Sequence, residues 1–318
     1  MNQDLFDECL AHYLSKFTLG KSWGKLADEF EYPDGEVLRQ DFKRERKRRG
    51  VPARGELPKA IVPTNCKILL YDIETTPILA LVWDIWNQNI NTEAILQDWH
   101  IISWGAKWLF DPDTMSDVLT PKEALAHDDR RITKSFWDLL EEADVVIGHN
   151  SNGFDNKRIN TRFLYHGLPP AHTYQSIDTL SEARRIFDIT SNKLDYINKY
   201  LGLQRKTHTN FELWLRVWKG DPEALKEMGE YNKDDVYILE DLFLRLRPFI
   251  KGVANLNLWD EEYVSVCPSC GSSDLNWKVR PHYTTVSRYP AFRCNTCGAV
   301  GRSKKTDLDL EKRRTVVR

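Results

Sequence analysis

The chain has no apolar run near the roughly 20 residues that a membrane-spanning helix requires. Its first residues, MNQDLFDECLAHYL, contain neither the basic stretch nor the apolar stretch of a secretory signal peptide. Cysteine is scarce, at six in 318 residues, which excludes a disulfide-stapled scaffold. Four of the six form two Cys-x-x-Cys pairs, a spacing that favours metal binding in a reducing compartment. We therefore expect a cytoplasmic protein without a membrane anchor.

Net charge is also low, at −2, but the charges are unevenly distributed. Residues 1–63 carry 12 Lys and Arg against 11 Asp and Glu, and residues 264–318 carry 11 against 4. The middle of the chain is left with 22 against 32. A basic end on an acidic body predicts contact with a polyanion such as nucleic acid, and a solubilising tail is the alternative.

Changes in composition divide the chain into five parts. Residues 1–50 are expected to be helical, and residues 51–65, which contain Pro and Gly, to be a linker. Residues 66–250 alternate strand-like and helix-like segments. Residues 264–303 hold the two cysteine pairs, and residues 304–318 form a basic tail.

The part from 66 to 250 is expected to begin with strands and to continue with alternating helices. KILLYDIE, LALVWDIWN and WHIISWGAKWLF are rich in β-branched and aromatic residues, and we interpret the tryptophan-rich stretch 83–108 as a pair of sheet strands. After ITKSFWDLLEEAD and the apolar VVIGHN, helices are expected near 153–166, 176–188, 191–201 and 221–248. This order predicts one mixed sheet flanked by helices.

Two carboxylates close the first strand. Side-chain alternation places Asp72 and Glu74 on the face that carries Ile68 and Leu70. Both faces are apolar up to the acids, as in a central strand, so the acids emerge together where the strand leaves the core. Such strand ends bind ligands in open α/β sheets. For an Asp-x-Glu pair alone, solvated acids at a strand exit are the more common explanation.

Two later segments also carry acids at inward-facing positions. Asp155 shares a helical face with Ile159 and Phe163, although a helix-start aspartate that only caps free N–H groups is an equal alternative. In YNKDDVYILEDLFLRL, Tyr231 and Asp235 lie on a stripe that continues into three leucines. A buried unpaired carboxylate costs several kcal/mol or is forced neutral, so either Asp235 has a cationic partner or the assumed phase of the helix is wrong.

Four converging carboxylates would repel one another strongly. Divalent cations are the economical remedy, because they are hard ions that prefer oxygen ligands. Two such ions about 4 Å apart are the known arrangement for in-line phosphoryl displacement. The pattern therefore predicts a site with two Mg²⁺ or Mn²⁺ ions.

The three motifs, in this order, resemble those of the DEDD superfamily of 3′→5′ exonucleases, which have an RNase H-like fold. YDIET resembles the first motif, and HNSNGFD resembles the second in the form found in proofreading domains of B-family DNA polymerases. YNKDD gives the Tyr-x3-Asp of the tyrosine (DEDDy) branch, whereas the histidine branch would need His in place of Glu230. SNKLDYINKYLGL resembles the segment that precedes the third motif. The resemblance covers residues 66–250 and implies an RNase H-like mixed five-stranded sheet.

The resemblance implies a role for each matching acid. Asp72, Glu74 and Asp235 would hold the first metal ion. Asp72 would bridge to the second ion, which Asp155 would hold partly through water. Tyr231 would orient the attacking water.

The resemblance also implies substrate contacts. Asn150 and Phe154 would touch the terminal nucleotide, and Lys193 would contact a phosphate. The 3′→5′ direction of hydrolysis rests on the resemblance alone. Because no polymerase domain follows, we expect a stand-alone exonuclease of phage or bacterial type, acting in a bacterial or phage-infected cell.

Residues 264–303 carry a zinc-ribbon signature. CPSCG and CNTCG lie 23 residues apart, and each has the Gly that permits the tight turn of a zinc knuckle. We predict one structural Zn²⁺, with four reduced thiols as the alternative; its ligands would be Cys267, Cys270, Cys294 and Cys297. Between the knuckles, Arg280 and Arg288 alternate with aromatic residues, which suits nucleic-acid binding or simply covers a small core.

Residues 1–50 are expected to form a helix-turn-helix-like module. SWGKLADEF is a short helix, EYPDG a turn with Asp34 as candidate N-cap, and EVLRQDFKRERKRR a longer helix that would enter a major groove. An ordinary helical hairpin with a solvated charged end is the alternative. Basic residues gather at the end of the longer helix: Lys43, Arg44, Arg46, Lys47 and Arg48.

These features together predict a metal-dependent 3′→5′ exonuclease that hydrolyses terminal phosphodiesters and releases nucleoside 5′-monophosphates. DNA is favoured over RNA as the substrate. One alternative is a DNA-binding regulator with an inert nuclease domain, against which the presence of all four acids and Tyr231 argues. Another is a nuclease of the same fold that acts on RNA or on branched or flap structures.

Overall fold

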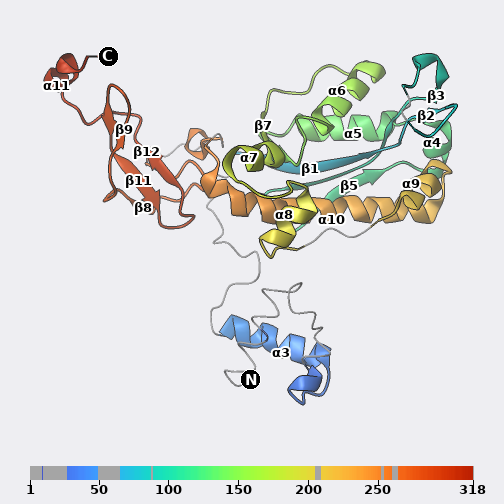
Figure 1. Ribbon diagram of the computed structural model, residues 1–318, viewed down its shortest axis with the longest axis horizontal. Helices are drawn as coiled ribbons and strands as arrows, with labels where there is room; N and C mark the ends of the chain where they lie inside the picture. The colour runs from blue at the N-terminus through green and yellow to red at the C-terminus, as the bar shows by residue number, and fades with distance from the viewer. Residues whose placement is uncertain are drawn as a thin grey trace.

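The computed structural model describes residues 9, 27–48, 65–86, 89–204, 209–251, 254–259 and 264–317. Its centre is a mixed five-stranded sheet with the order β5-β4-β1-β6-β7 (Figure 1). β1 pairs antiparallel with β4 and parallel with β6, so both of its edges are used. The predicted mixed sheet is confirmed. Its strands are β1 Ile68–Thr75, β4 Ile101–Trp108, β5 Met115–Val118, β6 Val145–Gly148 and β7 Gln175–Asp178.

Helices cover both faces of the sheet. In Figure 1, α10 runs along one face, and α5 and α6 lie on the other. Leu69 and Tyr71 of β1 pack into the core with α5 and α6, whereas Ile68 and Leu70 pack into the core with α10. Burial on both faces makes β1 rigid and fixes the direction of its last residues. The bounds of these helices are α5 Arg130–Leu140, α6 Asp155–His166 and α10 Pro222–Leu246.

The expected helix over 176–188 is wrong in its first part. Gln175–Asp178 forms β7, which pairs in parallel with β6, and only then does the chain become helical. The strand forms because the edge of β6 is free to pair with it, and no local sequence pattern indicates that pairing. Asp178 then caps the following helix. Among described residues 65–251, two α-helices were not predicted: α4, which precedes α5, and α9, which precedes α10. The smaller helices are α4 Pro121–Ala126, α7 Thr179–Ile186, α8 Leu194–Tyr200 and α9 Phe211–Trp218.

Residues 83–108 contain two strands, β3 and β4, as expected, but the two belong to different sheets. Residues 101–108 form β4, but residues 81–86 form no strand, and Trp83 is fully exposed. The preceding β2, Leu79–Ala80, pairs only with β3, Ile95–Gln97, after the short 3₁₀ helix Thr92–Ala94. Both edges of β1 are already taken by β4 and β6, so this segment cannot pair with β1.

The cysteine module, residues 264–303, lies at the end of the sheet to which the C-terminus of α10 leads (Figure 1). It contains a three-stranded sheet, β12-β11-β8, and a two-stranded ribbon, β10-β9. A short helix, α11 Leu310–Thr315, follows in the basic tail. The strands are β8 Leu275–Asn276, β9 His282–Tyr283, β10 Arg288–Tyr289, β11 Ala291–Cys294 and β12 Val300–Arg302.

The longer helix of the N-terminal part is present as α3, Gly35–Arg48. The side chain of Asp34 accepts a hydrogen bond from the backbone N–H of Val37 at 3.2 Å. This bond confirms the prediction that Asp34 is the N-cap of the helix. Residues 27–29 before the turn are helical, and the rest of the shorter predicted helix lies outside the described residues. No helix in the described parts of the chain is both long and apolar enough to span a membrane.

Helix α10 approaches β4 closely because Gly105 has no side chain. A Cβ atom there would lie 2.7 Å from the carbonyl oxygen of Asn232. In the ladder between β1 and β4, the partner of Gly105 is Asp72. The close approach therefore brings α10, with Asp235 one turn after Asn232, next to the end of β1 that carries Asp72.

Gly105→Ala should destabilise the protein by about 1–3 kcal/mol, because the added methyl group must push the backbone of α10 away from the sheet. Urea unfolding of the two proteins measures this difference. Gly229→Ala is the matched control, since its Cβ would lie 3.9 Å from Val118 and meet no clash. Alanine in a helix interior is favoured over glycine by about 1 kcal/mol, so the control should be neutral or more stable. Equal stabilities of the two variants would contradict the proposed packing constraint.

Candidate active site

Three carboxylates meet at the C-terminal end of β1. Asp72 and Glu74 leave this strand on one face, and Asp235 approaches from α10. One oxygen atom of each side chain lies within 4.8 Å of the others. Asp235 is buried, and the other two are half-buried. Tyr231 lies one turn before Asp235 on the same helix, buried, with its ring edge-on to Trp214.

Asp155 reaches the same strand from the start of α6. Its Oδ1 accepts a hydrogen bond from the backbone N–H of Ile73, the residue between Asp72 and Glu74, at 3.3 Å. Burial raises the pKa of Asp155 to about 7, and the negative charge of Asp178 adds to this rise. The aspartate therefore does more than cap its own helix, because it is joined to the strand that carries the other acids.

The central part of the chain matches a known superfamily. A family model described as RNase_H superfamily matches residues 110–247, a range that includes Asp155, Tyr231 and Asp235. The sheet order and the flanking helices agree with that match. The chain contains an RNase H-like domain.

Among the solved structures that are similar to this chain is that of the family B DNA polymerase from the hyperthermophilic archaeon Pyrobaculum calidifontis. The two chains are 21% identical in sequence, with a TM-score of 0.44. The similarity covers 58% of this chain and 25% of the polymerase chain, so it spans about a quarter of that chain. The comparison with curated proteins gave no match.

Two residues of the RNase H-like domain that sequence reasoning missed support Asp72. The side-chain amide of Asn232 donates to Asp72 Oδ2 at 2.7 Å, and its Oδ1 accepts from the Ser103 hydroxyl at 3.1 Å. Asn232 is completely buried. Asn232 lies within the motif YNKDD, between Tyr231 and Asp235, and this position in the sequence could have identified it as a candidate site residue. This chain of hydrogen bonds fixes the orientation of the Asp72 carboxylate.

A third missed residue, Asp178, organises the loop before Asp155. Its carboxylate accepts from the backbone N–H of Asn150 at 2.8 Å and of Asn152 at 3.3 Å. Asn150 has a left-handed backbone, with φ of 68°, and its side chain is exposed. The loop is therefore held in one conformation by a buried charge at the end of β7. No periodic pattern indicated Asp178, because its strand was interpreted as helix.

The three predicted substrate contacts surround this loop. Phe154 is half-buried at the start of α6, and Lys193 is exposed at the start of α8. The ring nitrogen Nε2 of His149 lies 2.9 Å from the carbonyl oxygen of Asn192, which brings the segment of Lys193 beside the loop. The arrangement is compatible with contacts to one ligand, which stay a prediction.

The acidic cluster fits a divalent cation. Its donors are hard carboxylate oxygens, and an octahedral Mg²⁺ with bonds near 2.0–2.1 Å gathers its ligand oxygens to separations of about 3–4 Å. One carboxylate oxygen from each of Asp72, Glu74 and Asp235 lies within 4.8 Å of the other two, so small side-chain movements would bring them to these separations. Burial also disfavours the charge of Asp155, so a nearby cation would stabilise its ionised form.

The four cysteines of the cysteine module form a second candidate metal site. The Sγ atoms of Cys267 and Cys297 are 3.7 Å apart, and those of Cys270 and Cys294 are 3.6 Å apart. A tetrahedral Zn²⁺ with Zn–S bonds of about 2.3 Å requires sulfur atoms about 3.8 Å apart. Hydrogen bonds from Cys267 and Cys270 lower the pKa of Cys297, so one thiolate is favoured before any ion binds. The cluster has the shape and chemistry of a structural zinc site.

A second acidic group, around Asp129, is a structural ion-pair cluster. Asp129 is completely buried and accepts two hydrogen bonds from the Arg162 guanidinium, at 2.7 and 2.5 Å. Its Oδ1 also lies 2.6 Å from His166 Nε2, and its Oδ2 accepts from the backbone of Ile101 at 2.8 Å. These partners already neutralise and satisfy the carboxylate, so the group anchors the start of β4.

The predicted nucleic-acid contacts have mixed outcomes. Arg280 is exposed, but Arg288 forms an ion pair with Asp307 at 2.9 Å, and Arg44 pairs with Asp41. These two arginines are therefore partly neutralised. The side chains of Lys43, Arg46, Lys47 and Arg48 lie outside the described part of the structure.

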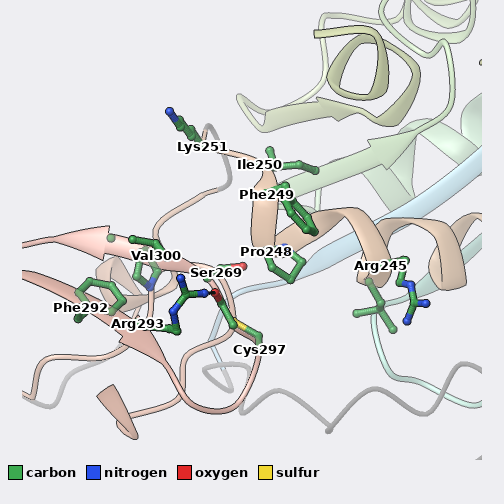
Figure 2. A pocket seen from close by; sticks show the side chains of 15 residues that line it. Arg245, Pro248, Phe249, Ile250, Lys251, Ser269, Phe292, Arg293, Cys297 and Val300 are labelled. Carbon is green, nitrogen blue, oxygen red and sulfur yellow. Dashed lines mark hydrogen bonds between the residues drawn. The ribbon is translucent and has the colours of Figure 1, made fainter. Parts of the chain in front are cut away.

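A pocket separates the end of α10 from the cysteine module (Figure 2). Arg245 and Lys251 line it from the side of the RNase H-like domain, and Arg293 lines it from β11. Exposed apolar side chains lie among these charges, notably Phe249 and Val300. The pocket contains none of the four carboxylates, so it is not the place where their chemistry would occur.

Proposed function

We propose that the protein is a divalent-metal-dependent 3′→5′ exonuclease of the DEDDy type that hydrolyses terminal phosphodiesters of DNA. The observation that carries the proposal is the meeting of Asp72, Glu74 and Asp235 within 4.8 Å, with Asp155 bonded to the same strand. The RNase H-like domain supports a nuclease. The 3′→5′ direction rests on the resemblance of the three motifs, in their order, to those of the DEDDy exonucleases.

The chain's own residues would act as follows. Asp72, Glu74 and Asp235 would hold one ion, and Asp72 and Asp155 a second. When bound, such ions supply an activated water and neutralise the charge that develops on the phosphate. The side-chain amide of Asn232 would keep the Asp72 carboxylate oriented for binding both ions. The Tyr231 hydroxyl would orient the water toward phosphorus, and the products would be nucleoside 5′-monophosphates.

The two terminal modules would hold the nucleic acid. Positive charge for binding phosphates comes from the basic end of α3 and from Arg280 in the cysteine module. Further positive charge lines the pocket of Figure 2, at Arg245, Lys251 and Arg293. We propose a structural Zn²⁺ in the cysteine module and DNA as the substrate. A nuclease of this fold that acts on RNA or branched structures would use the same residues.

Incubation of the purified protein with end-labelled single-stranded DNA and RNA, in Mg²⁺ or Mn²⁺, tests the proposal. We expect DNA labelled at its 5′ end to shorten stepwise and to release 5′-monophosphates, and we expect no shortening in EDTA. Blocking the 3′ terminus should protect the strand, whereas blocking the 5′ terminus should not. A folded protein that degrades neither nucleic acid with either ion would refute the enzyme and leave the non-catalytic DNA-binding alternative.

A further inference from the structure

Arg158 is held beside the carboxylates by two aromatic rings. Its guanidinium lies 4.2 Å from the ring centre of Trp99 and 4.5 Å from that of Phe154. Its Nη1 donates to the hydroxyl of Thr75, the residue after Glu74, at 3.2 Å. Contact with two aromatic rings and a hydroxyl restricts the guanidinium, so less side-chain freedom remains to be lost on binding.

Arg158 also belongs electrostatically to the acidic site. It lies one turn after Asp155 on α6, and the negative charges of Asp98 and Asp155 both attract its guanidinium. The neighbouring Arg162, one turn further on, is different, because its guanidinium is paired with Asp129 through two hydrogen bonds. Among the described residues, Arg158 forms no such ion pair, and one of its five N–H donors is used by a side chain.

We infer that Arg158 binds a phosphate of the substrate strand next to the phosphate that is cleaved. This inference rests on the proposed nuclease function. A restricted guanidinium with free donors matches the geometry of a phosphodiester. An acidic site also repels its substrate, and Arg158 supplies positive charge where the strand must enter. The rings of Trp99 and Phe154 position the guanidinium for this contact.

A purely mechanical role is the competing explanation. Trp99 belongs to the segment between β3 and β4, so Arg158 could merely fasten that segment to α6. Loss of such a fastener would lower stability and activity without regard to the charge of the substrate. The experiment must therefore ask whether Arg158 and one particular phosphate act together.

The test measures kcat/KM on single-stranded DNA with one uncharged methylphosphonate, placed at the second or at the third linkage from the 3′ end, the two linkages nearest to the terminal one. Arg158→Gln should lower kcat/KM on unmodified DNA roughly 10- to 100-fold, as expected for a lost charge-assisted contact. At one of the two positions, the methylphosphonate should slow the wild type similarly but cause no further loss in Arg158→Gln. Arg158→Lys should recover part of the activity, since it restores the charge without the planar fork.

Lys157→Gln is the matched control, because it removes the same charge from an exposed neighbour on α6. It should change kcat/KM less than about twofold and should respond to each methylphosphonate as the wild type does. If both methylphosphonates slow Arg158→Gln as much as they slow the wild type, the phosphate contact is refuted. The purely mechanical role of Arg158 is then the remaining explanation.

Failure of the nuclease proposal is a separate outcome. If the wild type cleaves nothing, binding of the same DNA is measured by fluorescence anisotropy at several salt concentrations. A lost phosphate contact lowers the slope of log Kd against log salt by about 0.7 for single strands. An unchanged slope in Arg158→Gln would refute the contact, whatever the fate of the nuclease proposal.

Discussion

Asp72→Ala is expected to lower the rate of DNA hydrolysis by roughly a thousandfold or more and to leave the protein as stable as the wild type or more stable. Metal ions in such sites contribute several kcal/mol to the transition state, and each 1.4 kcal/mol corresponds to a factor of ten in rate. Asp72 is the acid that touches both Asn232 and the shared oxygen cluster. Its removal also relieves repulsion among the acids in the metal-free protein.

Single-turnover rates in Mg²⁺ and in Mn²⁺ and melting temperatures in EDTA measure the two effects of Asp72→Ala. Asp234→Ala is the matched control, because this half-buried neighbour of Asp235 falls on another face of α10. It should keep its rate within a few-fold of the wild type. If Asp72→Ala retains most of the wild-type rate, the assignment of Asp72 as a metal ligand is refuted.

Cys270→Ser is expected to cost the protein its tightly bound zinc and the folded structure of the cysteine module. Structural Zn²⁺ in small modules binds with about 10–16 kcal/mol, and that free energy is folding free energy. The module has only a small core, in which the sulfurs pack around Phe292 and Ala299. Without the ion, this core is too small to offset the chain entropy.

Metal analysis should find one zinc per wild-type chain and close to none in Cys270→Ser. Limited proteolysis should then cut the variant within residues 264–303 while the RNase H-like domain stays intact. Cys66→Ser is the control: Cys66 is also a buried cysteine, but it lies outside the cluster. Zinc content that is equal in both variants, or absent from the wild type, would rule out the structural zinc site.

Much of the fold could be predicted because its central strand is unambiguous. A strand that is apolar on both faces must lie inside a sheet, and the period of α10 placed Asp235 and Tyr231 on its buried stripe correctly. β7 and the segment 81–86 could not be predicted. Whether an apolar stretch becomes a strand depends on a free neighbouring edge, which β6 offered and β1 did not.

The sequence by itself predicted which residues would carry the proposed chemistry, because acids in an apolar strand and in an apolar helix stripe call for a cation. The spacing of the four cysteines likewise specified their cluster, since two knuckles fix the ligand geometry locally. The tertiary structure alone revealed the residues that support the site. Asn232, Asp178 and Arg158 act through contacts with distant segments, at the points where α10, the β6 loop and α6 meet β1. Such contacts depend on how closely the elements approach, which in this chain Gly105 permits and no local pattern encodes.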